Sequence, residues 1–507
     1  MSFISIQFLA FLTVLLGVYF LVPRKWQWKV IPLFSIWFYL SYGVTSIGFI
    51  AATTIITYFM GICLNREDDR LTELKRKCTD KEQKKQYKEN CTKKKKRIML
   101  AGLSVNFGIW AVLKYTSLFD FFPLGISIYT FMAAGYCIDV YRGKYRAERN
   151  FLKYCSFITF FPHIVQGPFS RYDVLGETLF KEHQFDFERF GQGALRMVWG
   201  YCKKLVIAAR ISVVVELIMA GDSGYGGIYI FLLFILLPIR LYADFSGYMD
   251  IVAGLCQMMG IRIQENFIQP IFARSIDEFW RRWHVTLGAW FRDYVFYPVS
   301  MSKMVQNISK KCKKSVSPAT SRLIPSYIAL FLVWSATGLW HGGSLNYLLW
   351  GWINLFCIVT GMQFKTFYAR VKGRLHISDE NRVWQLVQMI RTFLIFGFAE
   401  MVSDTGSVYG IFMECKSLVC DHNWHLLLKP ILLFTGLEVR DLCILGIGVL
   451  LILLVDILKE KKISVNALLH RIPIIPRYAC YIMLLYSIIL FGYLGADAAE
   501  GFMYAQF

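Results

Sequence analysis

The sequence predicts an all-α, polytopic membrane protein with roughly 10–12 transmembrane helices, plus re-entrant and interfacial amphipathic helices around a central chamber. Of the 507 residues, 56% are apolar, 17% are aromatic and only 18% are charged, whereas soluble proteins carry about 25% charged residues. The mean hydropathy is +0.44. Because one spanning helix needs about 20 apolar residues, the chain can hold roughly ten spans with room for loops. This composition excludes a cytosolic enzyme, a disordered chain and a nucleic-acid-binding domain.

Apolar runs separated by polar loops mark the candidate spans. The first run has no basic region before it and no small-residue cleavage site after it, so we expect a retained span and not a removed signal peptide. In chain order the candidate spans are 3–22, 30–42, 44–64, 98–118, 124–140, 195–220, 228–243, 323–340, 344–364, 384–402, 439–458 and 474–495.

Basic loops predict the orientation of these spans. The net charge is +21, and such an excess gathers in the cytoplasmic loops of membrane proteins. The clearest loop, 65–97, holds 14 Lys/Arg and 7 Asp/Glu. We expect it to be a solvated charged hairpin, with lipid-headgroup or nucleic-acid binding as lesser alternatives. Alternation from this loop places the N-terminus outside, and it places in the cytoplasm the basic segments 23–25, 142–146, 303–322, 365–382 and 459–462.

Two stretches, 151–194 and 244–300, differ from simple spans. The first contains Phe161-Pro162-His163 and Gln166-Gly167-Pro168. In the second, Phe279–His284 alternates aromatic residues with arginine, which is typical of an amphipathic helix in the membrane interface. Irregular backbone at membrane depth is tolerated only where it is buried in protein or lines a water-filled cavity. The two stretches therefore predict a chamber, and we expect 244–300 not to form two ordinary spanning helices.

His341 is the strongest candidate for a functional group. No other strongly ionisable residue lies between Arg322 and Lys365, and ionisable groups at membrane depth default to functional hypotheses. Nearby glycines would let other backbone or a substrate approach. A satisfied core histidine and a general base acting on a hydroxyl are equally open alternatives. His163 and His284 also lie outside clear loops, whereas a structural role is expected for His183, His376, His422, His425 and His470.

Other catalytic signatures are missing from the sequence. It contains no G-x-S-x-G, no H-E-x-x-H and no G-x-x-x-x-G-K-[ST] motif, so a covalent serine mechanism, a zincin and a P-loop ATPase lack support. The 13 cysteines show no framework spacing, and most lie in apolar runs as small buried residues. The run Cys415-x4-Cys420-x-His422-x2-His425 has loose metal-ligand spacing, but a disulfide or free thiols are favoured there. We expect no metal site.

Several segments together carry a family resemblance. They resemble the membrane-bound O-acyltransferase family, in the bacterial branch of alginate O-acetylation and teichoic-acid D-alanylation membrane proteins. The resemblance covers most of the chain and implies a single membrane domain over 1–507, with the basic loop 65–97, a family core at 123–355 and C-terminal helices at 384–507. The segments that carry it are Pro123–Phe131, Ile138–Arg142, Phe161-Pro162, Gly167-Pro168, Asp244–Tyr248, Asn266-Phe267, Glu278–His284, Phe291–Tyr294, Trp340-His341-Gly342 and Gly501–Phe507.

The resemblance implies acyl transfer from a thioester donor to a hydroxyl acceptor. A thioester is already activated, so the protein need only place the hydroxyl near the carbonyl and accept its proton. His341 is the expected general base, and His284 either polarises a carbonyl or orients the donor. The candidate chamber-lining residues are Asp244, Ser246, Asn266, Arg282 and Trp340.

The leading functional hypothesis is O-acetylation of an extracytoplasmic polysaccharide or cell-wall glycan. The donor would be acetyl-CoA or an acyl carrier on the cytoplasmic side, with no bound cofactor and no nucleic-acid partner. Membrane lipid and an extracytoplasmic SGNH-hydrolase-like acyltransferase are the expected partners. D-alanyl transfer toward teichoic acid is the second hypothesis. A lipid or polysaccharide transporter without chemistry is the third, and unlike an acyltransferase it could function without His341.

Overall fold

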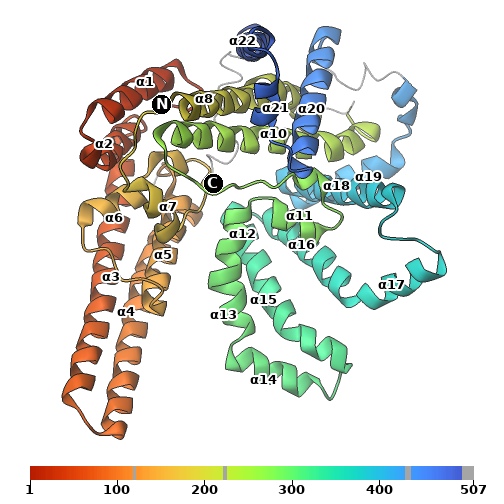
Figure 1. Cartoon of the computed structure of the whole chain (residues 1–507). Coiled ribbons are helices and arrows are strands. Elements are labelled where there is room, and N and C mark those ends of the chain that lie inside the picture. The colour runs from red at the N-terminus through yellow and green to blue at the C-terminus, as the bar shows by residue number, and fades with distance from the viewer. Residues whose placement is uncertain (117, 119–120, 221–224, 429–435, 494–507) are drawn as a thin grey trace. The chain divides into compact units, whose positions relative to one another are not determined.

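The structure, a computed structural model, describes residues 1–116, 118, 121–220, 225–428 and 436–493. Within these ranges the chain is helical and contains no β-strand, only an isolated bridge between Phe267 and Trp283. This confirms the all-α prediction. The helices in Figure 1 are α1 (Ile6–Leu21), α2 (Gln27–Leu40), α3 (Val44–Lys77), α4 (Lys81–Tyr115), α5 (Ile126–Arg142), α6 (Phe151–Ile158), α7 (Tyr172–Leu179), α8 (Phe187–Tyr201), α9 (Ala209–Met219), α10 (Ile228–Met259), α11 (Ile276–Arg282), α12 (Val285–Phe291), α13 (Tyr297–Ser300), α14 (Lys303–Cys312), α15 (Pro318–His341), α16 (Leu345–Gln363), α17 (Lys365–Arg374), α18 (Arg382–Asp404), α19 (Val408–Cys420), α20 (Val439–Glu460), α21 (Val465–Arg471) and α22 (Ile474–Phe491). Short 3₁₀ segments are η1 (Arg24–Trp26), η2 (Phe161–His163), η4 (Pro270–Phe272) and η6 (Trp424–Leu428), and π-helical segments are η3 (Cys202–Ala208) and η5 (Arg292–Phe296).

Eight of the described helices are long and apolar enough to cross a bilayer: α3, α4, α10, α15, α16, α18, α20 and α22. This confirms a multi-pass membrane protein. The other four predicted spans are shorter or interrupted. Helices α1, α2 and α5 have 16, 14 and 17 residues, and η3 interrupts the span predicted at 195–220. Even 17 helical residues extend only about 26 Å, less than the ~30 Å hydrocarbon core.

The chain packs as two compact units that alternate along the sequence. Unit 1 contains residues 1–194 and 252–264, and unit 2 contains 195–251 together with the described part of 265–503. Helices α8 and α10 each begin in one unit and end in the other. The single membrane domain over 1–507 stays a prediction.

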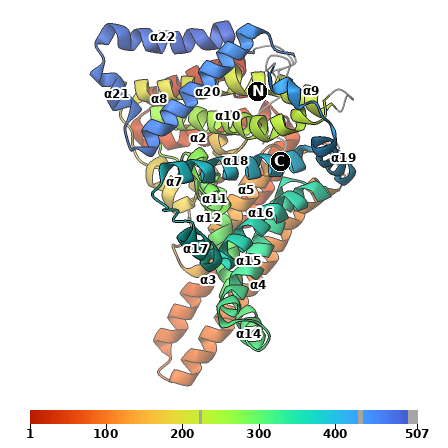
Figure 2. The same ribbon diagram turned by 90° about the vertical axis from the view of Figure 1, so that its right-hand side faces the viewer.

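In unit 1, α3 and α4 form a helical hairpin that carries the basic loop. They have 34 and 35 residues, about 50 Å each, which exceeds the hydrocarbon core. The two helices lie side by side in both views (Figures 1 and 2). Between the two helices, Lys95 Nζ of α4 lies 2.7 Å from Asp68 Oδ2 of α3. The charged hairpin expected at 65–97 is therefore a continuation of two predicted spans.

The stretch 151–194 is broken, as predicted. Helices α6 and α7 have only eight residues each, and between them the chain contains η2 and a cis peptide bond between Gly167 and Pro168. Nearly every side chain from Tyr154 to Ser170 is buried. This irregular backbone is thus enclosed by protein, which is the condition for its presence at membrane depth.

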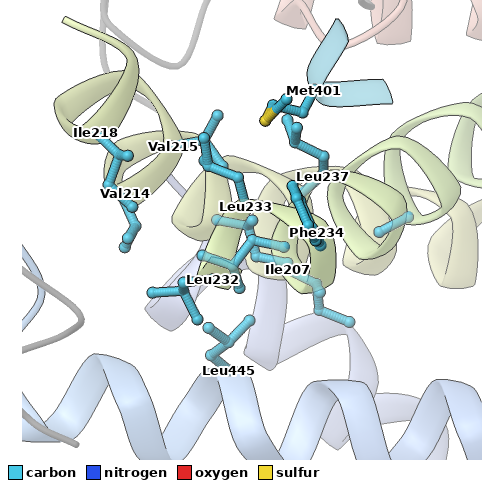
Figure 3. Packing of buried hydrophobic residues seen from close by; sticks show 14 of the residues in the cluster. Ile207, Val214, Val215, Ile218, Leu232, Leu233, Phe234, Leu237, Met401 and Leu445 are labelled. Carbon is cyan, nitrogen blue, oxygen red and sulfur yellow. The ribbon is translucent and has the colours of Figure 1, made fainter. Parts of the chain in front are cut away.

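In unit 2, the apolar core lies between η3, α9 and α10. Figure 3 shows Ile207, Val215, Leu233 and Phe234 packed together, with Met401 and Leu445 supplied by α18 and α20. One expectation is wrong here. The regular helix does not end at 243, because α10 continues to Met259. The non-spanning part of the second stretch begins only at Gly260, where φ is +85°. Beyond it come the short segments η4 and α11, and then α12, η5 and α13, which follow one another without a gap over 285–300.

Candidate active site

His341 is the last residue of α15, and the glycines around it serve helix packing. A Cβ on Gly338 would lie 2.6 Å from the Tyr347 carbonyl oxygen, and a Cβ on Gly351 would lie 2.6 Å from the Trp334 carbonyl oxygen. Helices α15 and α16 therefore approach until backbone meets backbone. The glycines near His341 could admit either other backbone or a substrate, and these contacts support the approach of other backbone.

Aromatic rings surround the His341 imidazole. The ring centroids of Trp340 and Trp350 each lie 4.8 Å from that of His341, with interplanar angles of 79° and 67°. The Tyr347 ring stacks at 6.4 Å. The side chain is buried, with 8% of the residue exposed. Sequence alone predicted an apolar setting, and the structure specifies it as a tryptophan-lined one.

His284 lies in the broken segment before α12, in a left-handed conformation with φ of +45°. Its Nδ1 lies 3.3 Å from Asn266 Oδ1, which also accepts hydrogen bonds from the Thr286 amide at 3.1 Å and the Thr286 hydroxyl at 2.8 Å. Because the amide proton can only be donated, this atom of Asn266 is the oxygen. His284 therefore donates through Nδ1–H, and its lone pair is on Nε2. Burial lowers the pKa of His284 to about 3, which keeps the ring neutral.

Trp340 connects the two histidines. Its ring centroid lies 6.3 Å from that of His284 and 4.8 Å from that of His341. The His284 ring also packs edge-on against Phe245 of α10, at 4.8 Å. Unit 2 thus brings His284 together with Trp340 and His341, although His284 precedes Trp340 by 56 residues in the chain. Asn266 holds the loop that carries His284.

The other predicted chamber residues belong to ion networks in unit 2. Lys204 contacts Asp244, and Lys203 Nζ lies 2.8 Å from Ser246 Oγ and 2.6 Å from Asp250 Oδ2. These contacts involve consecutive lysines in η3, and π-helical segments often occur at functional sites. Ser246 and Asp250 also line a small polar pocket, together with Tyr242 of α10 and Asp456 of α20.

Arg282 has a different set of partners. It contacts Glu278 at 2.9 Å and Glu460 at 2.8 Å, so it ties α11 to the end of α20. Sequence reasoning missed Lys203, Lys204 and Glu400, although a charge within a predicted span signals each of them.

No cluster of metal-ligating side chains occurs among the described residues. Cys415 and Cys420 are both free thiols on α19. The resemblance segment Gly501–Phe507 lies outside the described residues. The roles of all the site residues stay predictions.

Fold and site together define a class of protein: a multi-pass membrane protein, helical throughout its described ranges, with two buried histidines that both contact one tryptophan, a site suited to proton transfer. The chain belongs to the membrane-bound O-acyltransferase family, whose model matches residues 34–311, more than half of the sequence. It is therefore an O-acyltransferase. The matched range includes His284 and ends before His341.

Three relatives illustrate the similarity. "Probable alginate O-acetylase AlgI" of Pseudomonas fluorescens is 32% identical over 418 residues, covering 79% of this chain and 73% of the relative. "Peptidoglycan O-acetyltransferase" of Helicobacter pylori is 23% identical over 376 residues, covering 65% and 63%. "Teichoic acid D-alanyltransferase" of Bacillus subtilis is 28% identical over 283 residues, covering 54% and 67%.

Proposed function

We propose that this chain moves an acetyl group from a cytoplasmic thioester across the membrane for O-acetylation of an extracytoplasmic polysaccharide or cell-wall glycan. The observation that carries the proposal is that the rings of His284 and His341 both contact the Trp340 ring, in a chain similar over most of its length to a probable alginate O-acetylase. Two buried imidazole rings beside one indole suit a hydroxyl and a thioester that must meet in one orientation.

His341 accepts the proton of the acceptor hydroxyl while the oxygen of that hydroxyl attacks the thioester carbonyl. The C–O bond forms, the C–S bond breaks, and the departing sulfur takes the proton from the imidazolium. General-base catalysis of this kind contributes about 10²–10⁴-fold. Since the His284 lone pair is on Nε2, its role is to accept a hydrogen bond and so orient a substrate. The alternative role, polarising a carbonyl, would need a proton on that nitrogen.

The donor belongs to the cytoplasm and the acceptor to the outside, so the acyl group must cross the membrane. In this proposal the N-terminus is outside, and the hairpin at 65–97 and the segment 303–322 are cytoplasmic. Their lysines attract an anionic donor such as acetyl-CoA or an acylated carrier. An extracytoplasmic SGNH-hydrolase-like acyltransferase completes transfer to the glycan.

The test uses sided membrane vesicles with [¹⁴C]acetyl-CoA supplied on one face only. With the extracytoplasmic partner present on the other face, donor on the cytoplasmic face should label glycan there as an alkali-labile ester, and the rate should fall as salt rises. His341→Ala should reduce labelling at least 100-fold, whereas the exposed control His422→Ala should match the wild type. Labelling only with donor on the outer face, or a fully active His341→Ala protein, would overturn the proposal.

D-alanyl transfer is a second candidate function because of the similarity to a teichoic acid D-alanyltransferase. The same vesicles supplied with a D-alanyl carrier thioester separate the two functions. Incorporation of D-alanine but not acetate would select the second. A transporter without chemistry is disfavoured by membership of an acyltransferase family.

A further inference from the structure

A buried carboxyl group lies behind His341. Trp350 Nε1, on α16, donates a hydrogen bond to Glu400 Oε1, on α18, with a distance of 2.9 Å. The same Trp350 ring also contacts the His341 ring, and the two ring centroids are 4.8 Å apart. We propose that Glu400 is a positioning residue for acyl transfer, because it holds the Trp350 indole in the orientation that supports His341. This inference rests on the proposed function, in which His341 is the general base.

Glu400 is buried without a cation. Only 8% of the residue is exposed, and among the described residues no ion pair includes it. The nearby cation, Arg240, instead contacts Asp404 one helical turn further along α18, at 2.7 Å. Burying a carboxyl group is costly unless it is hydrogen-bonded, and the indole N–H provides that bond. The pairing of Glu400 with Trp350 is thus specific.

Helix packing positions the backbone of Trp350, and its buried ring also packs against Trp280 and Trp334, with centroids 5.5 Å and 5.9 Å away. Gly351 brings α16 against the Trp334 carbonyl, which locates the Cα of Trp350. Within this packing, a turn of the indole about χ2, a broad torsion for aromatic side chains, would move its N–H away from Glu400. The hydrogen bond to Glu400 selects one orientation, and this orientation decides which part of the ring faces His341.

The orientation matters when His341 becomes charged. As the imidazole takes the hydroxyl proton, it becomes a cation beside an aromatic ring, and such contacts are favourable. A carboxyl oxygen on the indole N–H raises the electron density of the ring and strengthens the attraction. The imidazolium exists only after proton transfer begins, so the benefit is specific to the transition state. Glu400 should therefore affect kcat more than KM.

The experiment compares Glu400→Leu, which removes the acceptor, with Glu400→Gln, which keeps it. With [¹⁴C]acetyl-CoA and sided vesicles, Glu400→Leu should lower kcat by about 3- to 30-fold, with KM for the donor within about 2-fold. Glu400→Gln should stay within about 3-fold of the wild type. The matched control is Glu414→Leu, since Glu414 binds the Thr405 hydroxyl at 2.8 Å and not a site residue.

A double-mutant cycle tests whether Glu400 acts through Trp350. Trp350→Phe keeps a ring beside His341 but removes the N–H, so it should lose about as much kcat as Glu400→Leu. In the Trp350→Phe background, Glu400→Leu should cause no further loss. If Glu400→Leu does not fold, Trp350→Phe tests the same hydrogen bond from its donor side.

Additive losses, or a Glu400→Leu protein as active as the Glu414→Leu control, would overturn the inference. So would Glu400→Gln being as impaired as Glu400→Leu. These outcomes differ from failure of the proposed function. An active His341→Ala protein refutes the function, whereas an inactive His341→Ala protein with normal Glu400 variants refutes only this positioning role.

Discussion

The buried ion network of Asp250 should be a main determinant of stability. Asp250 lies 2.6 Å from Lys203 Nζ and 2.8 Å from Arg196 Nε. The Lys203 and Asp250 side chains are only 5% and 7% exposed. Their remaining polar contacts are few: Lys203 also binds Ser246, and Arg196 also binds Glu265. Substituting one partner therefore leaves a charge in the protein interior.

The expected losses differ between the two partners. Removing one partner of a buried pair costs about 3–5 kcal/mol, because it leaves an uncompensated charge. The loss for Asp250→Leu should lie near the upper end of this range, since the Lys203 ammonium group then keeps only its hydrogen bond to the Ser246 hydroxyl. Lys203→Met should lie near the lower end, because Arg196 still neutralises Asp250. The double variant should recover much of the loss, since an apolar pair of similar volume replaces a buried ion pair with little cost.

Thermal unfolding in detergent, at a fixed protein concentration, measures these differences. The control pair is Lys181 and Glu177, whose side chains are 62% and 71% exposed. Glu177→Gln should change the free energy of unfolding by no more than about 1 kcal/mol. If Asp250→Leu and Glu177→Gln lowered the melting temperature equally, or if the double variant were worse than either single one, the assignment of a buried, mutually compensating pair would be wrong.

Three further predictions follow from particular residues. Asn266→Ala removes the acceptor of three hydrogen bonds and should lower vesicle transfer at least 10-fold in protein that is still folded; normal activity would show that His284 needs no such support. In single-cysteine variants, an impermeant maleimide should label Cys78 from the cytoplasmic side and Cys420 from the outside, and the reverse pattern would invert the topology. Burial lowers the pKa values of His163 and His284 to about 3, so below the ordinary histidine pKa near 6.5 the unfolded chain binds more protons and acid favours unfolding. Each of the two buried histidines should lower the free energy of unfolding by about 2 kcal/mol at pH 5. Asparagine tolerates the left-handed backbone at position 284, so His284→Asn should flatten the fall in melting temperature between pH 7 and pH 5. An unchanged slope would contradict this.

The candidate site was only partly accessible from the sequence. His341 and His284 were identifiable because they are ionisable groups outside polar loops. Their common neighbour Trp340 was adjacent to His341 in the chain, but its second contact, with His284, depends on how α12 and α15 pack in unit 2. Glu400 was identifiable as a charge within a predicted span, but its pairing with Trp350 was not, because the two residues are 50 positions apart and share no motif.

The sequence by itself determined the membrane class, most of the spanning helices and the charged hairpin. Those features depend on local hydropathy and charge, because the bilayer thickness sets the length of a spanning helix and the two aqueous faces differ in the loop charge they favour. Tertiary structure alone decided that α10 continues to Met259 and that Lys203 pairs with Asp250, 47 residues away. A charge that looks prohibitive in an apolar segment becomes acceptable once a partner helix supplies the opposite charge. Which helix does so is a property of packing, and no local pattern records it.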